Sequence, residues 1–157
     1  MTLKKLIFSS LLFIIFFAAC DEGRIYEESL KIPESEWERN ETAEFEFEIE
    51  DSLASYTFSL HFRHAGNYPY KNIYLFTKTK SPSGKLAVDT AQMILANNQG
   101  RWLGKGIGDI YDYQFQFKKG PIFPEKGKYK VEIEQAMREK TLSNVTDIGI
   151  GIKKINP

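Results

Sequence analysis

Apolar and polar residues alternate along several short stretches of this chain. In residues 44–50 every second side chain is phenylalanine or isoleucine, and every residue between them is glutamate. A period of two is typical of a β-strand that buries one face and exposes the other. The same period recurs in residues 56–63, 111–118, 129–134 and 148–153. Each of these stretches therefore predicts a half-buried strand.

Two further strands are expected at residues 73–79 and 85–94, on either side of Ser81-Pro82-Ser83-Gly84. In that tetrapeptide proline presets φ at the second position and glycine supplies freedom at the end, so it predicts a tight turn. Residues 136–142 give the only hint of a helical turn. Short strands separated by turns, without a long helical pattern, predict an all-β fold, an antiparallel β-sandwich of jelly-roll or immunoglobulin-like type.

The first twenty residues have a different character. Two lysines precede an apolar run from Leu6 to Ala19, and Cys20 follows. This order is typical of an export signal, and the run is shorter than the roughly 20 apolar residues of a membrane-spanning helix. Residues 17–20, Phe-Ala-Ala-Cys, resemble the lipobox of bacterial lipoproteins, which predicts cleavage before Cys20 and lipid attachment to its sulfur. An ordinary signal peptide with a chance cysteine, or a buried free thiol, is the alternative.

Cleavage at this point divides the chain into three parts. Residues 1–19 are the predicted lipoprotein signal peptide, residues 20–40 carry the lipidated cysteine and a tether that becomes a first, irregular edge, and residues 41–157 form the sandwich domain. The tether is acidic and without a sustained period, but it contains apolar residues such as Ile32 and Trp37. Part of it is therefore expected to lie against the domain.

Charge and catalytic motifs narrow the function. The chain has 21 basic and 21 acidic residues, and no basic stripe that would predict a nucleic-acid partner. The only histidines, His61 and His64, are three residues apart and should point to opposite faces of a strand, so they do not form a metal pair. No G-x-S-x-G motif is present, and the glutamates of residues 44–50 form a solvated row rather than an acid pair across a cleft. We expect no enzyme, no metal and no cofactor.

A glycine-rich stretch at residues 101–112 is the most distinctive segment. It contains three glycines at every second position, beside Trp102, Lys105, Asp109 and Asp112. These four residues are candidates for binding a partner. A bulged loop pinned by Trp102 is the structural alternative. Calcium binding is a further one, although two carboxylates fall short of the six or more oxygen ligands that calcium takes.

Tyr68 and Tyr70 form a second candidate, in the polar, turn-rich segment of residues 67–72. Their rings could stack on a sugar or a protein, or cover the end of the sandwich with their hydroxyls in water. The number of tyrosines does not decide between these alternatives.

Together with the lipobox, residues 67–76, 102–112 and 133–138 resemble the gliding-motility lipoprotein family GldH of the Bacteroidetes. The resemblance covers essentially the whole chain. It implies a cell-envelope lipoprotein needed for surface gliding, beside machinery linked to type IX secretion, and it carries over no catalytic residue. One departure is Ser81-Pro82-Ser83-Gly84, where the family pattern leads us to expect aspartates.

The first hypothesis is thus a lipid-anchored, non-enzymatic component or accessory of the gliding machinery, bound to the membrane by its lipid. Its partners would be other gliding or type IX secretion-linked envelope proteins, bound through residues 103–109. We favour the outer membrane with the domain in the periplasm, although Asp21 would favour the inner membrane under the enterobacterial rule. The rival is a carbohydrate-binding envelope lipoprotein that uses exposed Tyr68, Tyr70 and Trp102 as a stacking platform. A lipid-anchored inhibitor or chaperone has no particular sign in the sequence.

Overall fold

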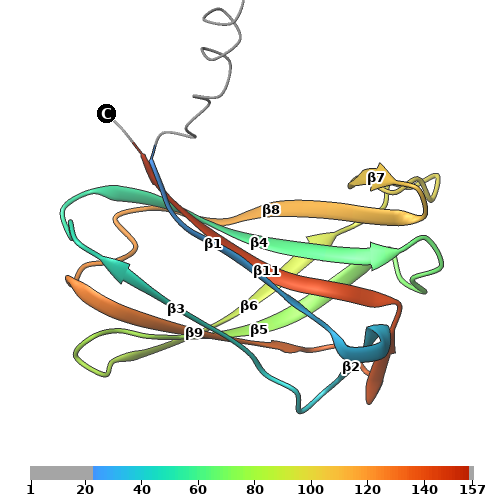
Figure 1. Cartoon of the computed structure of the whole chain (residues 1–157), viewed down its shortest axis with the longest axis horizontal. Helices are drawn as coiled ribbons and strands as arrows, with labels where there is room; N and C mark the ends of the chain where they lie inside the picture. The colour runs from blue at the N-terminus through green and yellow to red at the C-terminus, as the bar shows by residue number, and fades with distance from the viewer. Residues whose placement is uncertain (1–22, 156–157) are drawn as a thin grey trace, which may run out of the picture.

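A computed structural model describes residues 23–155 of the chain. The predicted signal peptide and Cys20 lie outside the described residues. These residues form an all-β sandwich of two large antiparallel sheets, with a small two-stranded sheet beside them (Figure 1). The predicted fold class is confirmed. Within residues 23–155 no helix is long and apolar enough to cross a membrane.

The first sheet has five strands and the second has four. In order across the first sheet, the strands are β1 (Arg24–Lys31), β11 (Val145–Ile155), β4 (Ser55–Ala65), β8 (Ile110–Gly120) and β7 (Lys105–Ile107). The second sheet has the order β3 (Ala43–Ile49), β9 (Gly127–Gln135), β5 (Asn72–Lys80) and β6 (Leu86–Ile94). The small sheet pairs β10 (Thr141–Ser143) with β2 (Glu36–Glu38), which follows a 3-10 turn, η2 (Pro33–Ser35).

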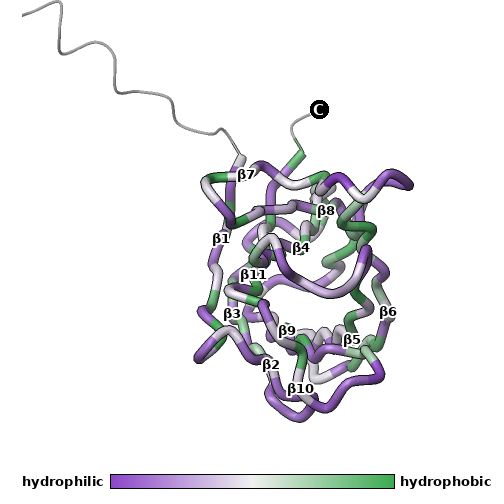
Figure 2. Tube along the Cα trace, turned by 90° about the vertical axis from the view of Figure 1, so that its right-hand side faces the viewer, coloured by the Kyte–Doolittle hydropathy of each residue, from purple (hydrophilic) through white to green (hydrophobic). Residues whose placement is uncertain are grey.

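The alternating stretches form the core as their pattern predicts. In β3 the burial alternates strictly, with Phe45, Phe47 and Ile49 inside and the glutamates outside. Phe47 stacks on Tyr129 of β9 with ring centroids 5.9 Å apart, and Phe123 meets both rings edge-on. Figure 2 shows the two sheets facing each other around this core. Tyr56 and Phe58 of β4 pack on Phe123 from the first sheet, so buried rings from both sheets hold the sandwich together.

The hint of a helical turn at residues 136–142 is wrong. These residues make bends and then β10, which pairs with β2 so that Leu142 lies opposite Trp37. Both side chains are fully buried. The Arg39 guanidinium donates to the carbonyls of Met137 and Glu139, at 3.0 and 3.1 Å, and satisfies backbone groups that a helix would have paired.

The sandwich has two ends, which we name by their position relative to Cys20. The anchor end comprises residues 23–24, 48–57, 79–87, 118–128 and 153–155, where β1 begins and β11 finishes. The distal end comprises residues 31–43, 64–72, 94–112 and 134–147, where β7, β2 and β10 lie (Figure 1). Because β1 begins at Arg24, the anchor end is the one nearest to Cys20 along the chain.

Candidate functional site

The two segments with candidate partner-binding residues come together at the distal end. Residues 66–71 connect β4 to β5, and residues 102–109 lead through β7 into β8. The amide of Gly66 donates to the carbonyl of Asp109 at 2.8 Å, and the Trp102 indole donates to the carbonyl of Gly66 at 3.2 Å. The structure therefore joins the tyrosine segment and the glycine-rich segment in one surface.

A buried histidine packs against the aromatic residues of both segments. His64 is fully buried at the end of β4, with its ring 4.5 Å from that of Trp102, 5.2 Å from Tyr68 and 5.7 Å from Tyr111, measured between centroids. Its Nδ1 lies 2.9 Å from the carbonyl oxygen of Ala65, which requires a proton on Nδ1. Burial lowers the pKa of His64, so the ring is neutral near pH 7.

Tyr68 does not belong to an exposed stacking platform, which corrects the expectation of the carbohydrate-binding alternative. Only 3% of Tyr68 is exposed, because its ring fills the end of the core against Phe62 and His64. Its neighbour Tyr70 is half-buried, at 73° to the Tyr68 ring, and its hydroxyl donates to Glu139. The three aromatic residues Tyr68, Tyr70 and Trp102 thus present no common flat face.

The glycine-rich segment forms a hairpin that projects from the aromatic cluster. Trp102 is half-buried, whereas Lys105, Ile107 and Asp109 are exposed. A Cβ at Gly104 would lie 2.8 Å from the carbonyl oxygen of Asp112. The close approach of these two backbone segments therefore requires glycine at position 104.

Ile107 lies within the predicted partner-binding segment, residues 103–109, although it is not one of the four candidates that the sequence singles out there. Its side chain is 87% exposed at the tip of the hairpin, and with Leu103 and Tyr113 it lines a partly apolar hollow. The signal in the sequence is an isoleucine placed between two glycines, with no core position for it to fill.

Asp112 lies in β8, and its carboxylate faces β4 rather than a metal site. Its Oδ2 accepts from Nη2 of Arg63 at 2.8 Å, and Nη1 of Arg63 lies 3.5 Å from Oδ2 of Asp147. These three residues lie in one row across the sheet, with Lys31 and Lys105 at its two ends. The row alternates in sign, which raises the pKa of Arg63 and fixes its guanidinium. Residues 23–155 contain no group of three or more metal-ligating side chains.

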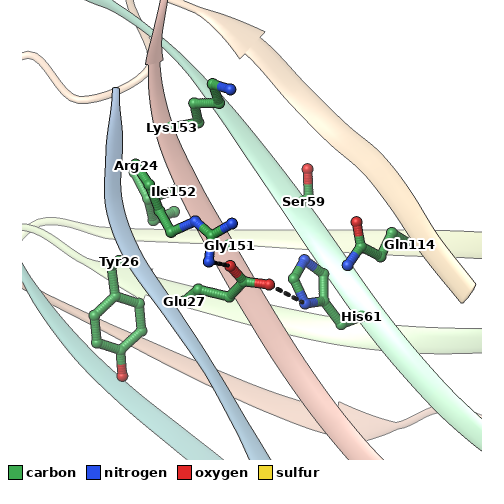
Figure 3. Close-up of a pocket in the computed structure, with 9 residues that line it drawn as sticks. All are labelled: Arg24, Tyr26, Glu27, Ser59, His61, Gln114, Gly151, Ile152 and Lys153. Atoms are coloured by element: carbon green, nitrogen blue, oxygen red, sulfur yellow. Dashed lines mark ion pairs between the residues drawn. The ribbon is translucent and has the colours of Figure 1, made fainter. Parts of the chain in front are cut away.

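A polar hollow on the outer face of the first sheet is a second candidate (Figure 3). Here β11 has Gly151 facing outward, and His61 of β4 lies over it, 2.9 Å from the position of a Cβ. Glu27 of β1 reaches across from the other side, with Oε1 3.9 Å from Nδ1 of His61 and Oε2 2.5 Å from Nη1 of Arg24. His61 thus faces outward and His64 inward, as their spacing predicts.

The hollow contains the Glu27–Arg24 ion pair, and the imidazole of His61 lies beside it. Burial lowers the pKa of His61, and the carboxylates of Glu27 and Asp112 raise it in part. Ser59 lies on the same face, and it points away from the imidazole without a hydrogen bond to it (Figure 3). Only the alternation of glycine and isoleucine in residues 148–152 signals this hollow in the sequence.

Comparisons with known proteins identify relatives over nearly the whole chain. The family model described as GldH lipoprotein matches residues 24–152. A gliding motility lipoprotein GldH homolog of Christiangramia forsetii is 36% identical over 148 residues, covering 90% of each chain. The gliding motility lipoprotein GldH of Flavobacterium johnsoniae is 34% identical over 151 residues, covering 92% of this chain and 93% of its own.

Solved structures are similar only at a coarse level. A family GH115 4-O-methyl-α-glucuronidase matches 87% of this chain and 18% of its own, with 11% identity and a TM-score of 0.47. The VP2 subviral particle of infectious bursal disease virus matches 83% of this chain and 30% of its own, with 12% identity and a TM-score of 0.33. Likeness at this level says nothing about activity.

Proposed function

The chain belongs to the GldH lipoprotein family and is a lipid-anchored envelope protein linked to gliding motility; from this premise we propose that it is a non-enzymatic component of the gliding machinery that binds a protein partner through its distal end. The observation that supports this proposal is the meeting of the two candidate segments at the end opposite to the one nearest Cys20. The partners would be other gliding or type IX secretion-linked envelope proteins.

The distal hairpin has the properties of a binding loop on a rigid base. Its tip exposes Ile107 and Leu103 by 87% and 47%, beside the charged side chains of Lys105 and Asp109. Its base is fixed by Trp102 and by the Gly66–Asp109 hydrogen bond. An exposed apolar tip with charged neighbours on a rigid support suits recognition of a protein surface.

The test is deletion of the gene in its host, scored for colony spreading, with complementation. Wild type should restore spreading, and Cys20→Ala should not. Ile107→Ser with Lys105→Ala should also fail while the protein accumulates at the normal level, because both side chains are exposed and removing them leaves the core intact. Trp102 is less suitable, since its loss would also disturb the packing around His64.

Val88→Ser is the matched control, because Val88 is an aliphatic residue 61% exposed on β6, which belongs to the other sheet from the hairpin strand β7. It should spread as the wild type does. If the hairpin variant spread as well as the control, the hairpin would have no role in motility. Normal spreading by the deletion strain would remove the role in motility in that host.

We place the lipid in the outer membrane and the domain in the periplasm. Protease digestion of intact and permeabilised cells tests this placement. Degradation in intact cells would instead place the domain on the cell surface.

A further inference from the structure

We propose that the anchor end docks on an anionic lipid bilayer, with Leu53 inserted among the acyl chains and lysines on the headgroups. This inference rests on the lipid attachment at Cys20 that is part of the proposed function. It adds a second, non-covalent contact with the membrane, which fixes how the sandwich is oriented.

The length of chain between the lipid and the sandwich brings the anchor end to the membrane. Arg24, where β1 begins, is four residue steps from Cys20, with residues 21–23 between them. An extended chain spans at most about 3.6 Å per residue, so this connection reaches at most about 14 Å. Gly23 is already tied to the fold, because its carbonyl accepts from the amide of Lys154 at 2.7 Å. Acyl chains on Cys20 therefore hold the start of β1 close to the bilayer surface.

The charge of the anchor end complements an anionic surface. Its cations include Lys80, Lys119, Lys126 and Lys128, all exposed, and no described carboxylate lies within ion-pair distance of any of them. At the distal end the exposed charges include a run of acids, namely Glu34, Glu36 and Glu38. Lysines next to a lipid anchor attract anionic headgroups, and the attraction falls off within a Debye length.

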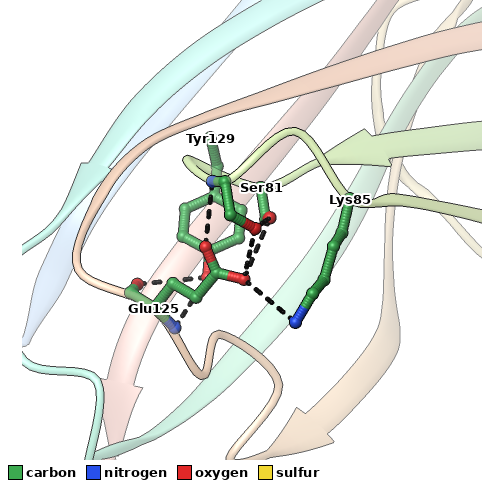
Figure 4. Close-up of polar contacts among 5 residues, drawn as sticks. Ser81, Lys85, Glu125 and Tyr129 are labelled. Carbon is green, nitrogen blue, oxygen red and sulfur yellow. Dashed lines mark hydrogen bonds and ion pairs between the residues drawn. The ribbon is translucent and has the colours of Figure 1, made fainter.

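The anchor end contains nine lysine and arginine side chains against four carboxylates. Glu48 and Glu50 are exposed, whereas the other two carboxylates are engaged within the protein. Asp51 pairs with Nζ of Lys154 at 2.8 Å, which lowers the pKa of Asp51. Glu125 accepts from the Ser83 amide at 2.9 Å and from the hydroxyls of Ser83 and Ser81 at 2.9 and 3.1 Å (Figure 4). Neither acid is thus available to cancel the lysines at the surface.

Leu53 is placed to enter the bilayer. Its side chain is 93% exposed at the turn between β3 and β4. The turn is fixed, because the Leu53 amide donates to Oδ1 of Asp51 at 3.1 Å and the Tyr56 hydroxyl donates to the Asp51 carbonyl at 2.6 Å. A single exposed leucine is ordinary on a protein surface. Beside a lipid anchor and a group of lysines, it matches the aliphatic and basic composition of a membrane-contacting face.

The loops that carry the lysines are also held in place. The Glu125 carboxylate joins the β5–β6 turn to the loop before β9, and the Tyr129 hydroxyl both accepts from the Glu125 amide and donates to its carbonyl (Figure 4). Lys126 and Lys128 flank Gly127 directly after this contact. The surface is therefore formed before it meets the membrane, so little conformational entropy is lost on docking.

The test uses the mature, lipidated protein in vesicles of phosphatidylethanolamine and phosphatidylglycerol. Cys20 is the only native cysteine, and the lipid occupies its sulfur, so Leu53→Cys and Ile107→Cys each add one thiol for a fluorescent label. Both positions are highly exposed and they lie at opposite ends. Iodide should quench the label at position 107 freely and the label at position 53 several-fold less. Equal quenching at the two positions would overturn the docking.

A charge series separates docking from the tether alone. Changing Lys119, Lys126 and Lys128 together to glutamine should lower the ratio of docked to undocked protein by roughly fivefold per lysine. The matched control changes exposed cations of the distal end, Lys31, Arg138 and Lys140, to glutamine and should have no effect. On phosphatidylcholine vesicles, the ratio of docked to undocked wild-type protein should be lowered as it is by the lysine changes. An unchanged ratio in the anchor-end variant would contradict the proposed surface.

Failure of the anchor and failure of the docking give different results. Protein that does not sediment with vesicles would overturn lipid attachment, and with it the docking. Protein that sediments while both labels remain open to iodide would overturn the docking and leave the anchor standing. A label at position 53 shielded only when cell-wall material is added would overturn the bilayer as occupant.

Discussion

His64 is an ionisable residue in a place where its charge cannot be stabilised. Its ring is fully buried among Tyr68, Trp102 and Tyr111, and among the described residues it forms no ion pair. Nε2 has no hydrogen-bond partner, so a second proton on the ring would be neither solvated nor paired. The fold therefore requires the neutral imidazole.

This requirement predicts a loss of stability in mild acid. Burial lowers the pKa of His64 below the usual histidine value of about 6.5, so in mild acid the unfolded chain binds a proton that the folded chain does not. The stabilising contribution is complete above the unfolded pKa and falls as the pH drops below it. Between pH 7.5 and 5.5 the free energy of unfolding should fall by up to about 1.4 kcal/mol through this residue, as measured by urea denaturation.

The variant His64→Phe keeps an aromatic ring and removes the titration. It should lose less stability than the wild type over the same pH interval. His61→Gln is the companion variant, since burial lowers the pKa of His61 as well. If the free energy of unfolding of His64→Phe fell as much as that of the wild type over this pH interval, His64 would not be the source of the acid sensitivity.

Residue-level burial at the distal end is where the sequence was least informative. Tyr68 lies in a segment rich in turn residues, and the carbohydrate-binding hypothesis required it to be exposed. It is buried because two segments far apart in the sequence, residues 62–70 and 102–111, meet around His64. By contrast, the opposite orientations of His61 and His64 follow from the two-residue period of a single strand. Local period is visible in a sequence, and the meeting of distant loops is not.

At the scale of elements, β11 depends on glycines that face outward. Gly149 and Gly151 alternate with three buried isoleucines, and side chains of the neighbouring strands lie over the space they leave. A Cβ at Gly149 would meet the Ser29 hydroxyl and lie 2.5 Å from the carbonyl oxygen of Glu28. A Cβ at Gly151 would meet only the imidazole of His61, which can rotate.

The two glycines should therefore differ in their tolerance of alanine. Gly149→Ala should lower the free energy of unfolding by about 2–3 kcal/mol, because backbone of β1 must move, and Gly151→Ala by about 1 kcal/mol. Urea denaturation at neutral pH measures both. His61→Ala should suppress the cost of Gly151→Ala, whereas Ser29→Ala should leave most of the cost of Gly149→Ala. Full recovery in the Ser29→Ala background would show that the backbone contact is unimportant.

Strands were predictable from sequence in proportion to their length and to the contrast between their faces. The alternation in β3, β4, β8, β9 and β11 needs only neighbouring residues, and those strands are confirmed. The three-residue strands β2 and β10 are too short to show a period, and only their pairing buries Trp37 against Leu142. β1 shows no clean alternation either, because it is an edge strand whose residues are mostly exposed.

At the scale of the molecule, the short connection to Cys20 and the character of the anchor end act together. Inserting about ten glycine and serine residues between Cys20 and Gly23 would let the ends of the linker lie roughly 15–20 Å apart on average. The effective concentration of the anchor end at the bilayer would then fall. The label at position 53 should become more open to iodide, while the protein still sediments with vesicles.

An inserted linker that leaves the quenching unchanged would show that surface contacts hold the anchor end without help from the short connection. A rigid insert of the same length is the matched comparison. It should lift the domain from the bilayer and expose position 53 fully.

The direction of β1 also has a mechanical consequence. β1 runs away from the anchor end, and its seven paired positions join it to β11 alone within the sheet. Tension between the lipid and a partner held at the distal end would pull β1 along its own axis, in shear against β11. The ladder hydrogen bonds would then share the load and have to rupture together, whereas a pull from the other end of β1 would unzip them one at a time.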